Sequence, residues 1–486
     1  MKRCLLILCS FVAVQVVLAD DPYNCAATQT INPPTNINTP WAFPNNWNLT
    51  TPAPQYAPNQ NCVWIINVPK GMYALFQVKS NYNKTSVLTI TDSTGYVDTI
   101  QVANNEPYFL MDPSFKVELQ ANQGGFMGMT VQWFQVNTKI YPFTYKVHPS
   151  SSPLALFAGD FDNSTVIQAD TQVSLLAFPP QATMLDLMPY MRLTQVYDGD
   201  SVNAKHVGNL YQIFNSRKSF VSSGKSLTLF SLYPGYNIGN LAVFQDYADV
   251  KQYKTYQAIY CIVPNICETS LNATEGTAAA IRYWPTYYIT YIGLQDNNKL
   301  SVYNGYVGAA QKLADYTKAT QQNNLPQKFN GRFTVFVLDQ GLTSISFAGD
   351  AQTAKWQVGF DNRQGFVASP NYGMQSSDQA FGEAIYSSST SDISYYFHSA
   401  ALLDDATLNV AITNGQKSAL NHTYTASKIT AGSVKGVGTG IVVKYQPNGA
   451  VTSGSYVSFK FEHHNSAVSH GILLVFGVSI LRYLGV

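Results

Sequence analysis

The segment RLTQVYDGDS at residues 192–201 places two aspartates, Asp198 and Asp200, around Gly199 at the end of an apolar, β-forming stretch. Carboxylates in such a loop could bind calcium, which takes about six to eight oxygen ligands, or could supply a catalytic acid. Asp-Gly is also a common turn between two antiparallel strands, because both residues tolerate positive φ. The strands and residues around this loop distinguish between these three roles.

Motifs of well-known enzymes are absent from the sequence. It has no His-Glu-x-x-His, no Gly-x-Ser-x-Gly and no Walker loop with its Lys-Ser/Thr. The adjacent His463 and His464 would point to opposite faces of a strand, which makes them a poor metal site. A triad assembled from distant residues stays open. We expect a protein that is not an enzyme and that has no cofactor and no metal ion.

Two aromatic clusters could bind a ligand. Trp41 and Trp47 stand in the proline-rich segment NTPWAFPNNW, where we expect them to be exposed and able to stack on a sugar or anchor a protein partner. In RYWPTYYITY (282–291), the alternation of Tyr287, Ile289 and Tyr291 favours the inner face of a strand. The two tryptophans are therefore the better candidate ligand contacts.

The first 19 residues have the pattern of a secretory signal peptide. Lys2 and Arg3 precede an apolar stretch that ends in Val17-Leu18-Ala19. At the other end, a mostly apolar tail follows Asn465 and Ser466, as in a GPI signal, although the spacer is short and Arg482 interrupts the tail. A short transmembrane helix or a buried strand stays an alternative. We expect export to the extracellular face of the plasma membrane, with a GPI lipid on Asn465 or Ser466.

Four cysteines remain once the leader is removed, and an exported chain most simply pairs them in two disulfides. Three pairings are possible. We favour Cys25–Cys62 and Cys261–Cys267, because each pair falls within one region of the chain. Export also makes glycosylation candidates of the asparagines in Asn-x-Thr sequons, which are Asn48, Asn83, Asn163, Asn272 and Asn421.

Composition favours short strands over helices and argues against nucleic acid as a partner. The chain has 486 residues, of which 46% are hydrophobic and 12% charged, with a net charge of +1. No strong field is present to attract nucleic acid. Aromatic residues are frequent, and Gly, Pro, Asn and Ser interrupt the chain every few residues. We predict an all-β protein with more than one domain.

The RLTQVYDGD pattern occurs in four copies. Its turn residues are Asp92, Asp198, Asn304 and Asn414, which lie about 106 to 110 residues apart. This period fits independent β-sandwich domains. Second apolar strands are predicted from Ser114, Ser226, Arg332 and Gly440, and third strands from Thr130, Leu241, Lys355 and Tyr456. We predict a signal peptide (1–19), four units (20–137, 138–258, 259–361, 362–465) and a C-terminal hydrophobic signal (466–486).

Several segments resemble CUB domains. GFVASPNYG (365–373) is similar to the opening strand of that family, and NQNCVWIINVPKGMYALFQV (59–78) resembles the segment that follows it. The whole chain looks closest to the divergent CUB-like proteins of nematodes. The resemblance implies tandem antiparallel β-sandwiches of the jelly-roll type. Four typical CUB domains would have two disulfides each, so here apolar packing must replace most of them.

The same resemblance predicts where calcium ligands would stand. Calcium-binding CUB domains have a glutamate about 14 residues and an aspartate about six residues before the turn. At the first position, this chain has Val78, Met184, Thr290 and Ala400. At the second position, it has Ser86, Arg192, Asn298 and Leu408. No unit has the set, and Asp198 is interpreted as a turn residue.

These observations favour a non-catalytic binding protein on the cell surface, made of tandem CUB-like domains. A role in innate immunity or pathogen response is implied by the family resemblance only. The alternative is a secreted carbohydrate-binding or matrix-structural glycoprotein, for which the aromatic clusters would be the contacts. The expected partner is an extracellular protein or glycan, and the expected membrane contact is the GPI lipid.

Overall fold

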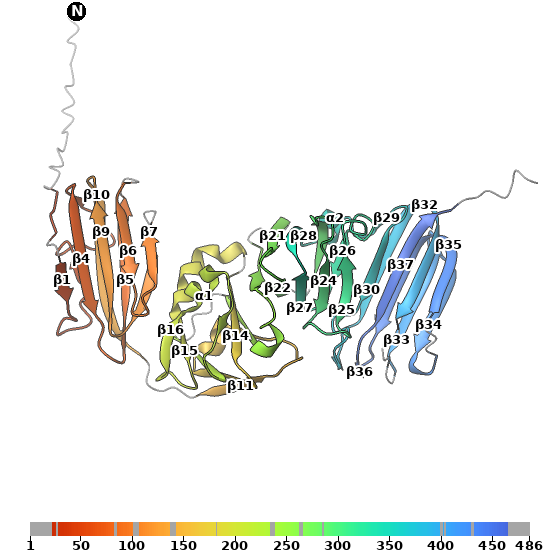
Figure 1. The fold of residues 1–486 in the computed structure, drawn as a ribbon, viewed down its shortest axis with the longest axis horizontal. Helices are drawn as coiled ribbons and strands as arrows, with labels where there is room; N and C mark the ends of the chain where they lie inside the picture. Colours follow the sequence, from red (N-terminus) through yellow and green to blue (C-terminus); the bar gives the residue numbers. More distant parts are fainter. Residues whose placement is uncertain are drawn as a thin grey trace, which may run out of the picture. The chain divides into compact units, whose positions relative to one another are not determined.

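The structure is a computed structural model, and it describes residues 22–25, 28–81, 85–100, 106–136, 142–180, 182–233, 239–261, 266–283, 286–398, 402, 405–428 and 432–464. The expected signal peptide, the sequon at Asn83 and the expected anchor sites Asn465 and Ser466 lie outside these residues. The chain divides into two compact units, 1–139 and 140–486. Strands dominate both units, which confirms the all-β prediction (Figure 1).

The first unit is a sandwich of two sheets. One sheet has the order β1 (Thr28–Ile31), β4 (Gln60–Asn67), β9 (Ser114–Ala121), β6 (Val87–Thr91), β7 (Val97–Ile100). The other has the order β2 (Trp41–Phe43), β10 (Gly125–Gln135), β5 (Met72–Asn81), β8 (Pro107–Met111), with β3 (Gln55–Tyr56) paired to β10. Alternate residues of each strand enter the core, as Phe115, Val117 and Leu119 of β9 do.

The second unit begins with two further sandwiches that repeat the same strand order, including a parallel edge pair in the five-stranded sheet. The first comprises β11 (Phe143–Val147), β13 (Thr165–Ala169), β18 (Ser226–Ser231), β15 (Thr194–Asp198), β16 (Lys205–Asn209) against β12 (Leu154–Phe157), β19 (Leu241–Asp246), β14 (Val173–Phe178), β17 (Phe220–Val221). The next comprises β20 (Thr255–Ile259), β22 (Ala278–Tyr283), β27 (Phe333–Leu338), β24 (Leu300–Asn304), β25 (Lys312–Tyr316) against β21 (Ile266–Ala273), β28 (Gly341–Ala348), β23 (Tyr287–Ile292), β26 (Gln327–Phe329).

The fourth region departs from this plan. Its main sheet has seven strands, with the order β30 (Gln364–Ala368), β37 (Tyr456–His463), β32 (Phe381–His398), β35 (Gly432–Gln446), β33 (Thr407–Asn414), β34 (Lys417–Thr425), and with β29 (Val358–Gly359) parallel to β32. Strands β31 (Ser376–Ser377) and β36 (Val451–Thr452) form a separate pair. The long strands β32 and β35 stay paired across a register shift, so they join what would otherwise be two sheets.

The residues that the structure describes contain few helices, and all of them are short. They are η1 (Ala158–Phe161), η2 (Ala182–Leu193), α1 (Leu210–Ser216), η3 (Tyr247–Asp249), α2 (Ala351–Ala354) and η4 (Ala426–Lys428). Within the part of the chain that the structure describes, every helix is too short or too polar to span a bilayer.

The four predicted hairpins are confirmed as the antiparallel pairs β6–β7, β15–β16, β24–β25 and β33–β34. One predicted third strand is wrong. The segment from Lys355 begins at the left-handed cap of α2, with φ 54° at Lys355, and the place of the third strand belongs to β28. The predicted boundaries after residues 258 and 361 also lie a few residues too far along the chain. Strand β20 pairs with β22 of the third sandwich, and β29 pairs with β32 of the fourth region.

The sandwiches of the second unit share apolar cores. Every residue of β14, VSLLAF, is buried. One face of the strand, with Leu175, packs in the core of the second sandwich, and the other face, with Leu176, packs against the third sandwich. A continuous apolar run is typical of a strand buried on both faces. Phe366 of β30 enters the core of the third sandwich, and Tyr288 of β23 enters the core of the fourth. Packing therefore links the second, third and fourth regions.

Candidate ligand-binding groove

The repeated turn residues do not share one role. Asp92 forms a local turn, accepting from the backbone N–H of Thr94 at 2.8 Å. Asp198 accepts the backbone N–H of Ser223 through both carboxylate oxygens, at 2.9 and 3.1 Å, and so fixes a loop distant in sequence. Asn304 is 1% exposed, and its amide nitrogen donates to the carbonyls of Pro370 and Tyr372. These contacts are structural in each case.

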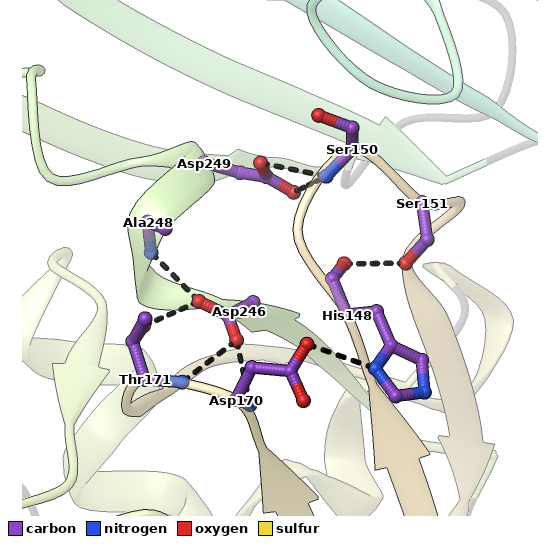
Figure 2. A network of polar contacts seen from close by, with 8 residues as sticks. All are labelled: His148, Ser150, Ser151, Asp170, Thr171, Asp246, Ala248 and Asp249. Atoms are coloured by element: carbon purple, nitrogen blue, oxygen red, sulfur yellow. Dashed lines mark hydrogen bonds and ion pairs between the residues drawn. The ribbon is translucent and has the colours of Figure 1, made fainter.

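Asp170, Asp246 and Asp249 lie in one network of polar contacts in the second sandwich (Figure 2). The buried carboxylate of Asp246 accepts from the backbone N–H groups of Asp170, Thr171 and Ala248 at 2.8 to 3.0 Å. Burial raises the pKa of Asp246, but these hydrogen bonds and the Thr171 hydroxyl outweigh it and lower the pKa below its ordinary value. The described residues contain no group of three or more His, Cys, Asp and Glu side chains that could hold a metal ion.

The same region contains a histidine, an aspartate and a serine, but they are not arranged as a triad. His148 Nδ1 lies 3.1 Å from Asp170 Oδ2, as a catalytic base and its orienting acid would. The hydroxyl of Ser151, however, donates to the backbone carbonyl of His148 at 2.6 Å and not to its ring (Figure 2). Ser151 is therefore not activated by this histidine.

The expected exposure of Trp47 is wrong. Its ring is 9% exposed, its Nε1 donates to the Pro52 carbonyl at 3.0 Å, and it covers Gly128 so closely that no side chain would fit there. Trp47 is thus a packing residue and is not available for stacking. Trp41 is half-buried and stacks on Phe43 at 6.3 Å, so part of its ring still faces solvent.

The aromatic strand β23 also differs from its prediction at one position. Tyr287 and Ile289 are fully buried, as the alternation predicts, but Tyr291 is 55% exposed. The pairing with β28 shifts register between Ile289 and Tyr291, and this irregularity turns the following side chain outward.

A groove of about 340 Å³ lies where the third sandwich meets the fourth region. Strand β25 of the third sandwich and strands β30, β32 and β37 of the fourth line it. On β32, alternation directs Tyr395 into the core and leaves Ser394 and Tyr396 on the groove side. Antiparallel pairing with β37 places Tyr396 opposite Ser458 and His398 opposite Tyr456. We call this cavity the Tyr396 groove.

Aromatic rings form one part of the Tyr396 groove. Tyr396 is 41% exposed, and its ring centre lies 4.5 Å from that of His398 in an edge-to-face contact. His398 in turn meets Tyr456 edge-on at 4.8 Å, and Tyr456 stacks on Phe366 at 5.0 Å. The Tyr456 hydroxyl donates to the Leu313 carbonyl at 2.7 Å. This chain of contacts restrains the rings, and Tyr396 at its end stays partly exposed.

Charge is low on the aromatic side of the groove. Burial lowers the pKa of His398 and raises that of Tyr456, which favours the neutral form of both rings. His398 Nε2 lies 3.0 Å from the Ser458 hydroxyl, so the two groups share one hydrogen bond. The aromatic side therefore offers ring faces and hydroxyls instead of charges.

Polar side chains complete the lining. Asp315 accepts from Ser301 at 2.6 Å and pairs with Lys312 at 2.5 Å, and although burial raises its pKa, these contacts lower it below the ordinary value. The amides of Asn324 and Gln364 and the hydroxyls of Ser394 and Ser433 also face the groove. Hydroxyls, amides and one carboxylate around a fixed aromatic ring can hold a polar, uncharged molecule.

The Tyr396 groove was not predicted from the sequence. The alternation in SDISYYFH contains the signal for an outward Tyr396, but the residues of the facing strand β25 lie about 80 positions earlier in the chain. Both disulfides, in contrast, are confirmed as Cys25–Cys62 and Cys261–Cys267. Asn48, Asn272 and Asn421 are exposed, whereas Asn163 is half-buried.

Residues 20–137 match the CUB-like domain family. Residues 146–232 and 248–350 match two families described as Domain of unknown function (DUF7592) and Domain of unknown function (DUF7591). The resemblance to CUB domains is thus shown for the first unit, and the next two sandwiches share its strand order. No curated protein matches the chain.

Two solved structures show weak similarity. The CUB1-EGF-CUB2 domain of human MASP-1/3 has 10% identity and a TM-score of 0.18, with 41% of this chain and 93% of that chain covered. The full extracellular region of zebrafish Gpr126/Adgrg6 has 9% identity and a TM-score of 0.18, with 68% of this chain and 53% of that chain covered. Neither value is high enough to support an assignment of function.

Proposed function

We propose that this protein is a non-catalytic extracellular binding protein and that the Tyr396 groove binds a saccharide. The observation that carries the proposal is the accessible Tyr396 ring, which is held by His398 and surrounded by hydroxyl and amide groups. A sugar presents an apolar face of C–H groups and an edge of hydroxyls. The ring would stack on the face, and the amides and serines would bond the edge.

The size and charge of the groove support this ligand class over a protein segment. A volume of about 340 Å³ lies at the small end of ligand cavities and suits one or two sugar rings. The charged side chains at its border are already paired, Asp315 with Lys312 and Lys460 with Glu462. A strongly charged ligand would have to compete with these pairs.

A glycan array probed with the purified full chain tests the proposal. We expect wild type to bind at least one glycan, and Tyr396→Ala to weaken that binding by about tenfold or more, the loss of roughly 1.4 kcal/mol. Tyr396→Phe keeps the ring and should retain most of the affinity. Tyr386→Ala is the matched control, because Tyr386 is on the same strand, is 46% exposed and does not line the groove.

Two results would overturn the saccharide proposal. One is the absence of binding to any glycan on the array. The other is a Tyr396→Ala variant that binds like wild type, which would place the ligand elsewhere, with the half-buried Trp41 as the next candidate.

The location that we propose for this binding protein is the outer surface of the plasma membrane, held by a GPI lipid at Asn465 or Ser466. The CUB-like domain at 20–137 and the two disulfides support an extracellular location. A phosphatidylinositol-specific phospholipase should release the protein from expressing cells. Protein that stays on cells after treatment would contradict the anchor but not the groove. A part in pathogen response rests on the family resemblance alone.

A further inference from the structure

A buried guanidinium without a carboxylate partner lies beside the second disulfide. Arg282 on β22 is 7% exposed, and its Nη1 donates to Cys261 Sγ at 2.7 Å. Its other contacts are the rings of Tyr287 and Phe347, at 4.4 and 4.7 Å from the guanidinium carbon. Among the described residues no carboxylate forms an ion pair with it, and its Nε has no hydrogen-bond acceptor. A buried cation is thus directed at a neutral sulfur.

The contact matters because the charge of that sulfur depends on its oxidation state. A disulfide sulfur is a weak acceptor and compensates a buried cation poorly. A thiolate in the same place would form an ion pair with Arg282, and an adjacent arginine is one of the settings that stabilise thiolates. Arg282 therefore favours the reduced, thiolate form of Cys261 over the oxidised form.

A cavity lies beside the partner cysteine. Cys267 is 7% exposed and is one of the residues that line a cleft of about 560 Å³ between the second and third sandwiches. Arg217, Lys218 and Glu268 also line the cleft, and the excess of positive over negative charge would favour the approach of an anionic thiol. This cleft and the Tyr396 groove share no lining residue.

We propose that Cys261–Cys267 is a thiol-exchangeable disulfide whose leaving group is the Cys261 thiolate, stabilised by Arg282. An incoming thiolate attacks Cys267 Sγ from the cleft and forms a mixed disulfide. The bond between Cys261 and Cys267 breaks, and Cys261 Sγ takes the electron pair. A second thiolate attacks the incoming group, which leaves Cys267 as a thiolate that takes up a proton, while the reductant becomes a disulfide. The reductant class is an anionic low-molecular-weight thiol such as glutathione.

The first unit holds an internal control. Cys62 is fully buried, and its sulfur contacts the neutral amide oxygen of Gln60 at 3.8 Å. Within the described residues no cation contacts the sulfurs of Cys25–Cys62. The two disulfides therefore share one chain and one solution but differ in the group that faces the sulfur.

Equilibration of the full chain in glutathione buffers tests the proposal. Thiols are trapped by alkylation, and the reduced fraction of each pair is measured by mass spectrometry of its peptides. We expect Cys261–Cys267 to be half reduced at a value of [GSH]²/[GSSG] about tenfold or more below that for Cys25–Cys62. We expect Arg282→Met to remove most of this difference. Arg332→Met is the control, because Arg332 lies over Tyr283 in the same sandwich and is exposed.

A second variant covers the case in which Arg282→Met does not fold. Cys267→Ser leaves Cys261 as a free thiol beside Arg282, and the pH dependence of its alkylation measures the thiol pKa. We expect a pKa well below the ordinary value of about 8.5. Equal reduction of the two disulfides, no effect of Arg282→Met on a folded protein, or an ordinary pKa for Cys261 would each overturn the proposal.

Discussion

The carboxylate of Glu383 on β32 forms an ion pair with the ammonium of Lys328 on β26, so one charge pair joins the fourth region to the third sandwich. The second oxygen of Glu383 accepts from Trp356 Nε1 at 2.8 Å. The side chains are 17% exposed for Lys328 and 9% for Glu383. Trp356 belongs to the apolar core of the fourth region, so removal of one partner would leave the other charge in a largely buried place.

Glu383→Gln should lower the free energy of unfolding by about 3 kcal/mol, because Lys328 would keep a poorly solvated charge without its partner. Urea unfolding followed by tryptophan fluorescence measures the loss. Lys318→Gln breaks an exposed pair with Asp296 and should cost less than about 1 kcal/mol. Similar losses in the two variants would contradict a special role for the Glu383 pair.

The buried Asp246 predicts acid sensitivity of the second sandwich. Its folded pKa lies below the unfolded value, so its stabilisation is complete above the unfolded pKa and is lost as the pH falls through the folded pKa. Asp246→Asn should cost about 2 kcal/mol at neutral pH and should flatten the fall in melting temperature below about pH 4. Calorimetry over a pH series measures both effects. An unchanged acid limb in the variant would show that other carboxyls cause it.

The close contact between Gly128 and Trp47 predicts a steric defect. A Cβ built on Gly128 would lie 2.4 Å from Trp47 Cε2. Gly128→Ala should therefore destabilise the first unit by about 2 kcal/mol, because the indole is held by its bond to Pro52. Gly159→Ala, whose Cβ would meet no atom within 4 Å, is the comparison in the same unfolding assay. Equal stability of both variants would mean that Trp47 can move aside.

The sequons should differ in glycan occupancy. Asn48 and Asn272 are exposed, and their side-chain oxygens accept the backbone N–H of Thr50 and Thr274, each at 3.0 Å. In the Asn163 sequon, Thr165 is fully buried within β13. We expect glycans at Asn48 and Asn272 and a lower occupancy at Asn163. Peptide mapping of the exported protein after enzymatic deglycosylation measures this, and a fully occupied Asn163 beside a bare Asn48 would contradict it.

Much of the local structure could be predicted from the sequence. The turn motifs around Asp92, Asp198, Asn304 and Asn414 place four hairpins correctly, because turn chemistry and strand alternation act over a few residues. Both disulfides could be paired by their closeness along the chain. The predicted third strand from Lys355 was wrong, because Lys355 is the left-handed cap of a short helix. The alternation of apolar residues after it does not reveal this cap.

The candidate sites depended on contacts that no local pattern contains. Trp47 looked exposed beside its prolines, but Gly128, which makes room for its ring, lies far along the chain. Tyr396 is a candidate ligand contact because residues of the third sandwich line the opposite side of its groove.

Strand type, hairpins and cysteine pairs depend on neighbours along the chain, and they could therefore be predicted from the amino-acid sequence. The faces that meet in the folded protein could not, and they include the Tyr396 groove, the Lys328–Glu383 pair and Arg282 beside Cys261. Burial and charge pairing depend on how one sandwich packs against the next region, whereas alternation along a strand shows only that a side chain points away from its own core.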